Sequence, residues 1–253
     1  MAYSAALGET DARYFDTALG ERLSSHPVFP VCYEWPVSQP IRHIPALTAF
    51  FPLLVHAEHD LVIHRPARPG DRLETLARID AVVPKKPGAF VVFAFETRDA
   101  SGGRVSTTRF GALYRGVAVE GGARGEPIEL PDPVQDAKSM GEVAVPANAA
   151  HVYTECARIW NPIHTDVAHA RAAGLPDIIL HGTATLALSV SQVLRAVRTA
   201  PERVRRIRCR FTGMVRMPST LDVRGREQAH GVGFETHGPA GESVIGRARI
   251  DFG

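Results

Sequence analysis

A histidine, an asparagine and a glycine lie close together in a pattern suited to acyl chemistry. The chain reads Trp-Asn-Pro-Ile-His at 160–164, continues through an Ala-rich stretch, and reaches Leu-His-Gly at 180–182. His164 follows a turn stiffened by proline, and Gly182 opens a predicted helix. An imidazole can accept and return a proton, and the free amides at a helix start stabilise charge on a carbonyl oxygen. The pattern therefore predicts chemistry on an activated acyl group.

Helices on both sides of this turn are predicted to position His164 and Gly182. A helix is expected over 147–158, before the turn. After it, Thr165 can cap a short helix that carries Asp166 in its first turn, where a carboxylate suits the helix dipole. Apolar residues repeat at helical spacing over 183–197. Because 207–251 alternates like an antiparallel sheet, the pattern predicts an α+β arrangement of a long helix on a sheet.

A short sequence repeat divides the chain into two halves. Phe-Glu-Thr occurs at 95–97 and again at 234–236, and the copies lie 139 residues apart. A Gly and a Val follow each copy at the same distances. Each copy reads as a strand, a turn with glycine and a further strand. Two copies of one sheet-forming unit are therefore predicted.

The segment between the copies is predicted to be a linker. It is rich in Gly, Pro and acidic side chains and shows no regular period. We expect a first domain over 1–118, a linker over 119–140 and a second domain over 141–253 that carries the turn. Nothing in the first half matches the Asn-Pro-Ile-His turn, so that half is interpreted as a degenerate scaffold that shapes an acyl pocket.

Composition and charge argue against several classes of protein. The 253 residues are 45% hydrophobic and 22% charged, which is typical of a globular chain in water. A net charge of +2 is too small to indicate a nucleic-acid or membrane partner, and no apolar run is long enough to span a bilayer. Three widely spaced cysteines and an N-terminus without a signal-peptide profile favour a reduced, cytoplasmic location.

Arginines gather locally in the second half. They stand at Arg203, Arg205, Arg206, Arg208 and Arg210. One interpretation is a strand with a solvated basic face. The other is that Arg205, Arg206 and Arg208 bind the phosphates of a ligand such as coenzyme A, because the guanidinium group matches phosphate geometry.

The block from Trp160 to Gly182 resembles the MaoC-like family of (R)-specific enoyl-thioester hydratases and dehydratases. The family's turn runs Ser-Gly-Asp-x-Asn-Pro-Leu-His, followed by a short helix ending in Ala-Gly and by Leu-His-Gly. The resemblance extends over the whole chain, which is similar to the double hot-dog hydratase 2 unit of peroxisomal multifunctional enzymes. Val55-His56-Ala57-Glu58 and Pro69-Gly70-Asp71 fit the first half of that unit. The resemblance implies an α+β double hot-dog fold, in which each sheet wraps a central helix.

The resemblance also implies roles for particular residues. His164 matches the catalytic histidine, Asn161 a site asparagine, and Gly182 the glycine whose amide holds the thioester oxygen. The family's catalytic aspartate falls at Ile159, which can neither accept nor donate a proton. The usual mechanism, in which Asp and His together grip the water, therefore cannot operate unchanged.

Three explanations of Ile159 are open. A neighbouring carboxylate, Glu155 or Asp166, could fill the gap. A related version of the family motif, Tyr-Ser-x-x-x-x-Asn-x-His-x-Ile-His-Tyr-Asp, aligns with Tyr153-Thr154, His164 and Asp166 and indicates a site led by histidine. In the third, the chain binds acyl thioesters without hydrating them, since losing one of two acid–base groups costs about 10²–10⁴ in rate.

Further residues near the turn receive secondary assignments. Trp160 and His181 are placed at the substrate pocket, and Asp166 is counted with the catalytic group. His56 and Glu58 are interpreted as ordinary residues of a strand start. No Cys/His cluster has metal spacing and no Gly-rich loop follows a strand, so we expect neither a metal nor a nucleotide cofactor.

The sequence as a whole predicts a hydro-lyase for acyl thioesters. It would hydrate 2-enoyl thioesters, or dehydrate 3-hydroxyacyl ones, carried by coenzyme A or acyl carrier protein, and it is expected to be a homodimer. A thioesterase on the same scaffold is one alternative, because a fold does not fix a function. A non-catalytic acyl-binding or partner subunit is the other.

Overall fold

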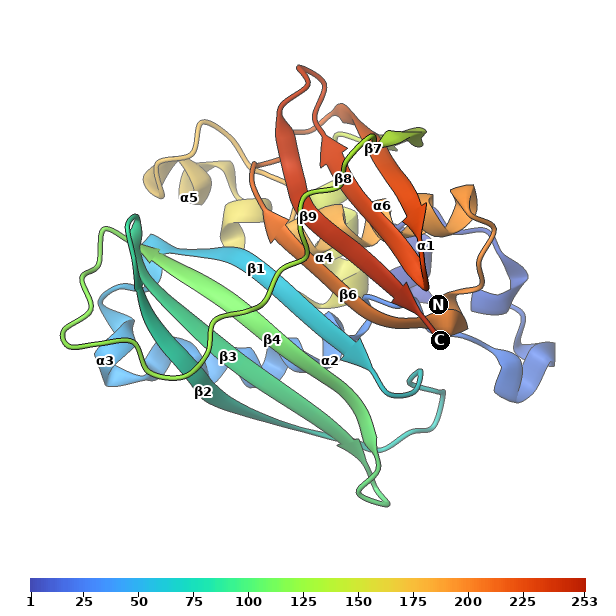
Figure 1. Ribbon diagram of the computed structural model, residues 1–253, viewed down its shortest axis with the longest axis horizontal. Coiled ribbons are helices and arrows are strands. Elements are labelled where there is room, and N and C mark those ends of the chain that lie inside the picture. The colour runs from blue at the N-terminus through green and yellow to red at the C-terminus, as the bar shows by residue number, and fades with distance from the viewer.

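One antiparallel sheet runs through both halves of the chain. The computed structural model describes the backbone of residues 1–253 and the side chains of all of them except Glu21, Arg22 and Arg42. The sheet has nine strands in the order β2-β3-β4-β1-β6-β9-β8-β7-β5 (Figure 1). Strands β1 to β4 come from the first half and β5 to β9 from the second. The predicted α+β class and double hot-dog architecture are confirmed.

The strands and helices have the following bounds. The strands are β1 Leu54–Ile63, β2 Leu73–Lys85, β3 Gly88–Asp99, β4 Arg104–Arg115, β5 Lys138–Val145, β6 Val204–Phe211, β7 Ser219–Gln228, β8 Gly231–His237 and β9 Ser243–Phe252. The α-helices are α1 Ala2–Ala6, α2 Pro30–Ser38, α3 Pro45–Thr48, α4 Ala149–Ala157, α5 Val167–Ala172 and α6 Gly182–Ala196. The 3₁₀ turns are η1 Ala12–Tyr14, η2 Thr17–Arg22, η3 Gln39–His43, η4 Phe51–Leu53, η5 Pro162–His164 and η6 Pro201–Arg203.

The two halves meet where β1 pairs with β6. The pairing is antiparallel and extends from Glu58 opposite Arg210 to Val62 opposite Arg206. Two ion pairs reinforce it: Asp60 accepts two hydrogen bonds from Arg206, each 2.8 Å long, and Glu58 accepts one from Arg210 at 2.8 Å. The carboxylates are buried and the arginines partly exposed, so each pair contributes more than a fully solvated one.

The sequence repeat corresponds to one strand in each half. Phe95 and Thr97 lie on β3, between β2 and β4, and Phe234 and Thr236 lie on β8, between β7 and β9. All four side chains are buried. The repeated residues therefore mark the central strand of each three-stranded meander, which confirms the predicted repeat of a sheet-forming unit.

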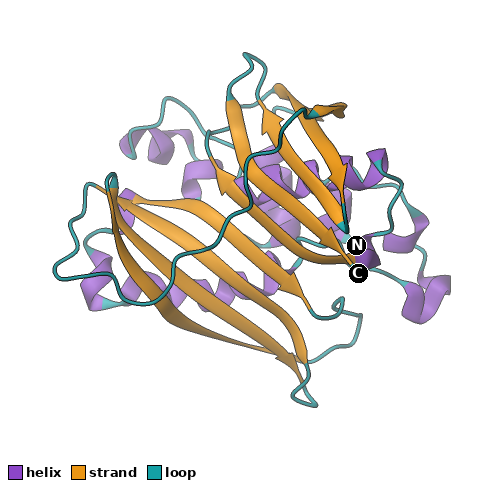
Figure 2. Ribbon diagram, viewed as in Figure 1, coloured by secondary structure: helices purple, strands orange, loops and turns teal.

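Helices cover one face of the sheet, and the central helices of the two halves differ in length (Figure 2). Helix α6 closely matches the predicted 183–197 segment, and most of its side chains, including Leu186 and Val190, are buried in the main core. Helix α2 is shorter and contains Pro36, which removes a main-chain hydrogen bond inside the helix. The first half thus has a short helix interrupted by proline where the second half has a long one, which agrees with its interpretation as the degenerate half.

The opposite face of the sheet is crossed by the connection between β4 and β5 (Figure 1). This segment, residues 116–137, is called the strap below. Arg124 of the strap forms a bridge with Val82 on β2, while Ile128 and Leu130 are buried against Phe90 and its neighbours on the sheet. At the far end Arg247 on β9 donates hydrogen bonds to two strap carbonyls. The strap therefore covers apolar surface that the sheet would otherwise expose to water.

Two local expectations need adjustment. The short helix α5 is capped by Asp166, whose carboxylate accepts a hydrogen bond from the amide of His169 at 3.0 Å, and not by Thr165. Aspartate is at least as good a cap as threonine, and η5 already contains the main-chain bond of Thr165. Strand β5 begins at Lys138, within the predicted linker 119–140. Among the described residues, no helix is long and apolar enough to cross a membrane.

The strap yields a test of what covers the outer face. Ile128→Ala removes a buried side chain that contacts the sheet, and we expect the free energy of unfolding to fall by about 2–4 kcal/mol. Limited proteolysis should then cut within residues 116–137 faster than in the parent protein. The adjacent Glu129 is exposed, so Glu129→Ala serves as the matched control. Equal cleavage of all three proteins would contradict the packing described here.

Candidate active site

The predicted turn forms between α4 and α5. Helix α4 ends at Arg158 in the left-handed conformation (φ 57°, ψ 37°), which redirects the chain. Asn161 is extended (φ −135°, ψ 116°), as expected for a residue that precedes proline. Pro162 then starts the 3₁₀ turn η5, and the amide of His164 bonds to the carbonyl of Asn161 at 3.0 Å. The local sequence thus fixes the backbone at His164 without help from a ligand.

His164 is buried, 9% exposed, and held by one hydrogen bond. Its Nδ1 lies 2.8 Å from the carbonyl oxygen of Ile179. A carbonyl can only accept, so Nδ1 carries the proton and donates, which leaves Nε2 with a free lone pair. Burial lowers the pKa of His164 to about 4, more than the carbonyl bond raises it. The side chain is therefore a neutral imidazole at pH 7, with Nε2 able to accept a proton.

His181 lies against His164, ring to ring. The centroids are 3.7 Å apart and the planes are inclined by 26°. Nε2 of His181 lies 3.3 Å from the carbonyl oxygen of Ile159 and 3.3 Å from Oγ1 of Thr154, while Nδ1 is buried with no hydrogen-bond partner among the described residues. Burial, and then the neighbouring His164, lower the pKa of His181 to about 2. The pair is two stacked, uncharged imidazoles.

The position of the family's aspartate is apolar in space as well as in sequence. Ile159 is 5% exposed and packs in the main core. Asp166 is exposed, and its carboxylate accepts the hydrogen bond from the His169 amide that caps α5. Glu155 is exposed as well. Among the described residues, no carboxylate forms a hydrogen bond with His164. The catalytic role of Asp166 stays a prediction, with a structural role as helix cap now visible.

Gly182 begins α6, next in the chain to His181. The first amides of an α-helix lack an intrahelical partner, and the helix dipole makes that end positive. A Cβ at Gly182 would lie 3.3 Å from the ring of Phe211, so glycine also permits close packing with β6. The amide that could polarise an acyl carbonyl thus adjoins the stacked imidazoles. Trp160 is 54% exposed, and Asn161 is partly buried beside the turn.

The three arginines assigned to phosphate binding have partners within the protein. Arg206 pairs with Asp60 and Arg208 with Asp251, while Arg205 donates to the carbonyls of Glu202 and Val204. Between the arginines, Ile207 and Cys209 point into the main core beside α6. Arg206 and Arg208 therefore lie on the opposite face of β6 from α6. Phosphate binding by these residues stays a prediction, and the visible role is to pair carboxylates across the sheet.

The first half contains a structural counterpart of the turn that the sequence comparison within the chain did not reveal. Matched residues are separated by 150 positions: Tyr3 and Tyr153, Gly8 and Arg158, Tyr14 and His164, and Asp16 and Asp166. Both Gly8 and Arg158 have positive φ, and both aspartates cap the following helical turn. Helix α1 packs on α4, and the two matched tyrosine hydroxyls lie 3.4 Å apart. Tyr14 thus occupies the histidine's place, which makes this copy unable to act as a base at neutral pH.

Two further histidines, His56 and His59, lie in this region. From the sequence, His56 is interpreted as an ordinary strand residue and His59 is not considered. The ring of His56 stacks on Phe110 at 3.8 Å and lies 4.6 Å from Phe211, the residue beneath Gly182. His59 lies 5.3 Å from His56 and is fully buried. Regular alternation would place residues 56 and 59 on opposite faces of a strand. The irregular pairing between His56 and Glu58 brings both side chains to the inner face, which sequence alternation alone does not indicate.

The described depressions in the surface lie elsewhere. The larger, of about 500 Å³, is lined by residues of β5, β7, β8 and the turn after β8, such as Asp222 and His237. A much smaller one lies beside His26, Tyr33 and Arg65 in the first half. The first of these is polar and open, and neither includes His164.

Comparison with known proteins agrees with this geometry. A family model described as MaoC like domain matches residues 133–248, and one described as FAS1-like, dehydratase domain region matches residues 1–108. Peroxisomal multifunctional enzyme type 2 from Mus musculus is 26% identical over 224 residues, which are 83% of this chain and 29% of that protein. The peroxisomal hydratase-dehydrogenase-epimerase of Saccharomyces cerevisiae is 28% identical over 200 residues, 74% of this chain and 21% of that protein. The chain spans less than a third of each of these relatives.

Solved structures share the fold. A MaoC-like dehydratase from Phytophthora capsici superposes with a TM-score of 0.85 at 21% identity, covering 100% of this chain and 90% of that one. A protein from Mycobacterium tuberculosis described as having a double hot-dog fold gives 0.63 at 16% identity, covering 99% and 90%. The continuous sheet defines a double hot-dog protein, and its second half carries the histidine turn. Residues 133–248 form a MaoC-like domain, and residues 1–108 match a FAS1-like dehydratase domain region.

The buried imidazoles predict how stability depends on pH. His59 and His164 have pKa values of about 4, lowered from 6.5. Between pH 4 and pH 6.5 the unfolded chain binds more protons than the folded one. The free energy of unfolding therefore rises with pH in this range, and the protein loses stability as the pH falls from 6.5 toward 4. Each such group contributes up to about 1.4 kcal/mol per pH unit in that window.

We therefore expect Tm to be lower at pH 5 than at pH 7. His59→Leu should flatten the dependence of Tm on pH, whereas His43→Gln, at an exposed histidine, should leave it unchanged. If the parent protein had the same Tm at pH 5 and at pH 7, these imidazoles would not be buried as described.

Proposed function

We infer that the chain is a hydro-lyase that adds water reversibly to 2-enoyl thioesters, with His164 as the acid–base group. The observation that carries this inference is the tether of Nδ1 to the Ile179 carbonyl, which leaves Nε2 free beside the start of α6. The match of residues 133–248 to a MaoC-like domain supports hydration or dehydration at the level of reaction class. Coenzyme A or acyl carrier protein would be the carrier; a homodimeric state and a cytoplasmic location stay predictions.

A single imidazole can manage both protons of the reaction. As the water oxygen bonds to C3 of the enoyl group, Nε2 of His164 takes the proton whose O–H bond breaks. The electron pair of the double bond moves toward the thioester carbonyl, where the amide of Gly182 would hold the enolate-like oxygen. The imidazolium then returns a proton to C2, which restores the carbonyl. Dehydration is the same sequence in reverse, and no further reactant is required.

The surroundings of His164 make this chemistry slower than in a site with two acid–base groups. A base with a pKa of about 4 is uncharged at pH 7 and accepts a proton only weakly. The bond to Ile179 orients the ring, and the stacked His181 restrains it. In this proposal Asn161 would orient the water from the turn. We expect low but measurable turnover.

A second candidate function rests on Ile159. The resemblance assigns the family's aspartate to this position, and Ile159 there is buried among apolar residues. A protein that binds acyl thioesters without converting them is compatible with such a site. Saturable binding of a 2-enoyl thioester with no change at the enoyl absorbance band would favour this candidate. Release of free thiol would indicate a thioesterase.

Substitution of the histidine tests the proposed mechanism. His164→Ala removes the proposed base, and we expect kcat/KM for hydration of a short 2-enoyl-CoA to fall by about 10²–10⁴. His169→Ala, at an exposed histidine on the adjacent α5, is the matched control and should keep the parent rate. Circular dichroism should show the same fold for all three proteins. Full activity in His164→Ala would remove this residue from the mechanism.

Ile159→Asp tests whether position 159 can hold a carboxylate. The substitution places an acid in a buried apolar site, so we expect the free energy of unfolding to fall by several kcal/mol. The near-isosteric Ile159→Leu should cost less than about 1.5 kcal/mol. Denaturant unfolding of the two variants gives the comparison. If Ile159→Asp were as stable as the parent, the position would be accessible to water.

A further inference from the structure

The inner face of the first half is more polar than an ordinary hydrophobic core. It is formed by β1, β3 and β4 on the side that carries α2. Its apolar part includes the aromatic residues Phe93, Phe95, Phe110 and Tyr114 together with smaller side chains such as Val91. Between them the same face presents serine, threonine and histidine side chains that are also buried.

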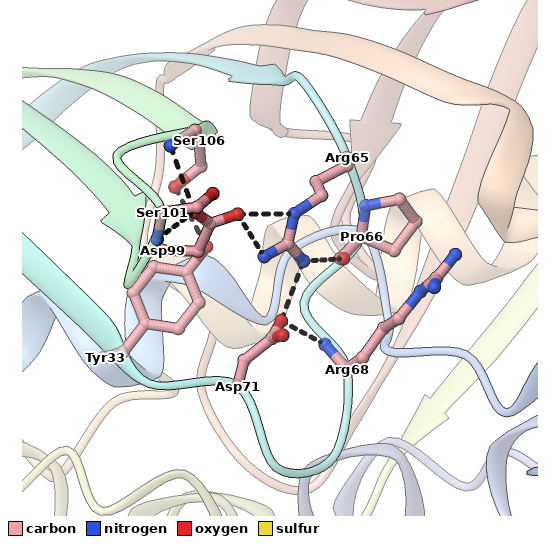
Figure 3. A network of polar contacts seen from close by, with 9 residues as sticks. Tyr33, Arg65, Pro66, Arg68, Asp71, Asp99, Ser101 and Ser106 are labelled. Carbon is pink, nitrogen blue, oxygen red and sulfur yellow. Dashed lines mark hydrogen bonds and ion pairs between the residues drawn. The ribbon is translucent and has the colours of Figure 1, made fainter. Parts of the chain in front are cut away.

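The polar groups furthest from Gly182 are satisfied within the protein. The hydroxyls of Tyr33 on α2 and Ser106 on β4 lie 2.9 Å apart (Figure 3). The next inward residue on β4, Thr108, donates a 2.6 Å hydrogen bond to Glu34. Burial raises the pKa of Glu34 to about 8, so this carboxyl is mainly protonated at pH 7. Arg65 nearby is likewise bound, by Asp71 and Asp99.

The polar groups nearest to Gly182 are not satisfied. His59 pairs with Phe110 on β4 and is 1% exposed, yet neither of its ring nitrogens has a hydrogen-bond partner among the described residues. His56 lies beside it, and its Nε2 is also buried and unpartnered. A buried polar atom without a partner lowers stability, so native proteins keep few of them without a functional reason.

A row of rings joins these histidines to the candidate active site. Phe211 packs under Gly182, His56 lies 4.6 Å from Phe211, and His59 lies 5.3 Å from His56. An acyl chain whose thioester oxygen is held at Gly182 would have to run along this row to enter the first half. There it would meet the unpartnered Nε2 of His56 and both unpartnered ring nitrogens of His59.

We propose that His56 and His59 select acyl thioesters whose chain carries a hydroxyl or keto oxygen beyond the reacting carbons. The proposal rests on the proposed function, since it takes the thioester to lie at Gly182. A neutral imidazole offers one donor and one acceptor, so a hydroxyl can bond to either nitrogen and a keto oxygen can accept from N–H. A plain alkyl chain in the same place would leave these atoms unpaired. The substrate class is thus oxygenated enoyl or 3-hydroxyacyl thioesters.

The test compares two enoyl-CoA substrates of equal length, one plain and one with a hydroxyl at successive carbons along its distal chain. The measured quantity is the ratio of kcat/KM for the hydroxylated substrate to that for the plain one. In His59→Leu we expect this ratio to fall about 2–10-fold from the parent value for at least one hydroxyl position, which corresponds to one neutral hydrogen bond. An unchanged ratio at every position overturns the proposal.

A second readout separates selection from packing. Because His59→Leu removes two unpartnered atoms, its Tm at pH 7 should match or exceed that of the parent while the ratio falls. A lower Tm with an unchanged ratio would show that His59 only fills the core. His237→Leu is the matched control: His237 also has a buried, unpartnered Nδ1, but it lies on β8 beside the polar depression. Its substitution should leave the ratio unchanged.

Failure of the proposed function can be distinguished from failure of this inference. If the parent protein converts neither substrate, the hydratase assignment fails. Calorimetric titration with the corresponding saturated acyl-CoA pair then still measures the preference for the hydroxyl. Preference that His59→Leu weakens supports the inference without catalysis, whereas equal affinity of the parent and His59→Leu for both ligands overturns it.

Discussion

The pairing of β1 with β6 is the interaction on which the rest of the molecule depends. It places the inner faces of two half-sheets side by side, so that His56 from the first half approaches Phe211 from the second. On the outer face, the same two strands bring Glu58 and Asp60 to the arginines of β6. Without this seam, each half would be a separate sheet with an exposed edge.

The second constraint is electrostatic. His59, His164 and His181 are buried, and burial is the main cause of their lowered pKa values. An aspartate at position 159 would favour the charged form of a nearby imidazole, and isoleucine does not. In this structure the two rings are held by carbonyl contacts and by stacking on each other.

Sequence patterns gave the second half with good accuracy because its signals are local. The spacing of apolar residues located α6 to within one residue at each end, and Asn161-Pro162 determined the turn. Helix α2 was missed, since Pro30 and Pro36 obscure helical spacing and only tertiary contacts keep the segment helical. The counterpart of the turn around Tyr14 was missed because the shared feature is backbone geometry, while the residue types differ.

The site residues also divide into those that a local motif identifies and those whose contacts depend on distant parts of the chain. His164 and Gly182 could be identified from their spacing in a motif, and the structure brings them to the same place. The alternation of β6 could have indicated that Arg206 and Arg208 share a face, but not that their face is opposite α6 or that Asp60 and Asp251 bind them. The partners of a charged side chain come from distant parts of the chain, and a single sequence does not reveal them.

The packing of α1 on α4 has a consequence for how the molecule is made. Tyr3 meets Tyr153 across a separation of 150 residues, so the start of the chain leaves the ribosome long before its neighbour exists. During that interval the apolar side of the first helix has nothing to cover it. Separate expression of the two halves would remove this contact from both.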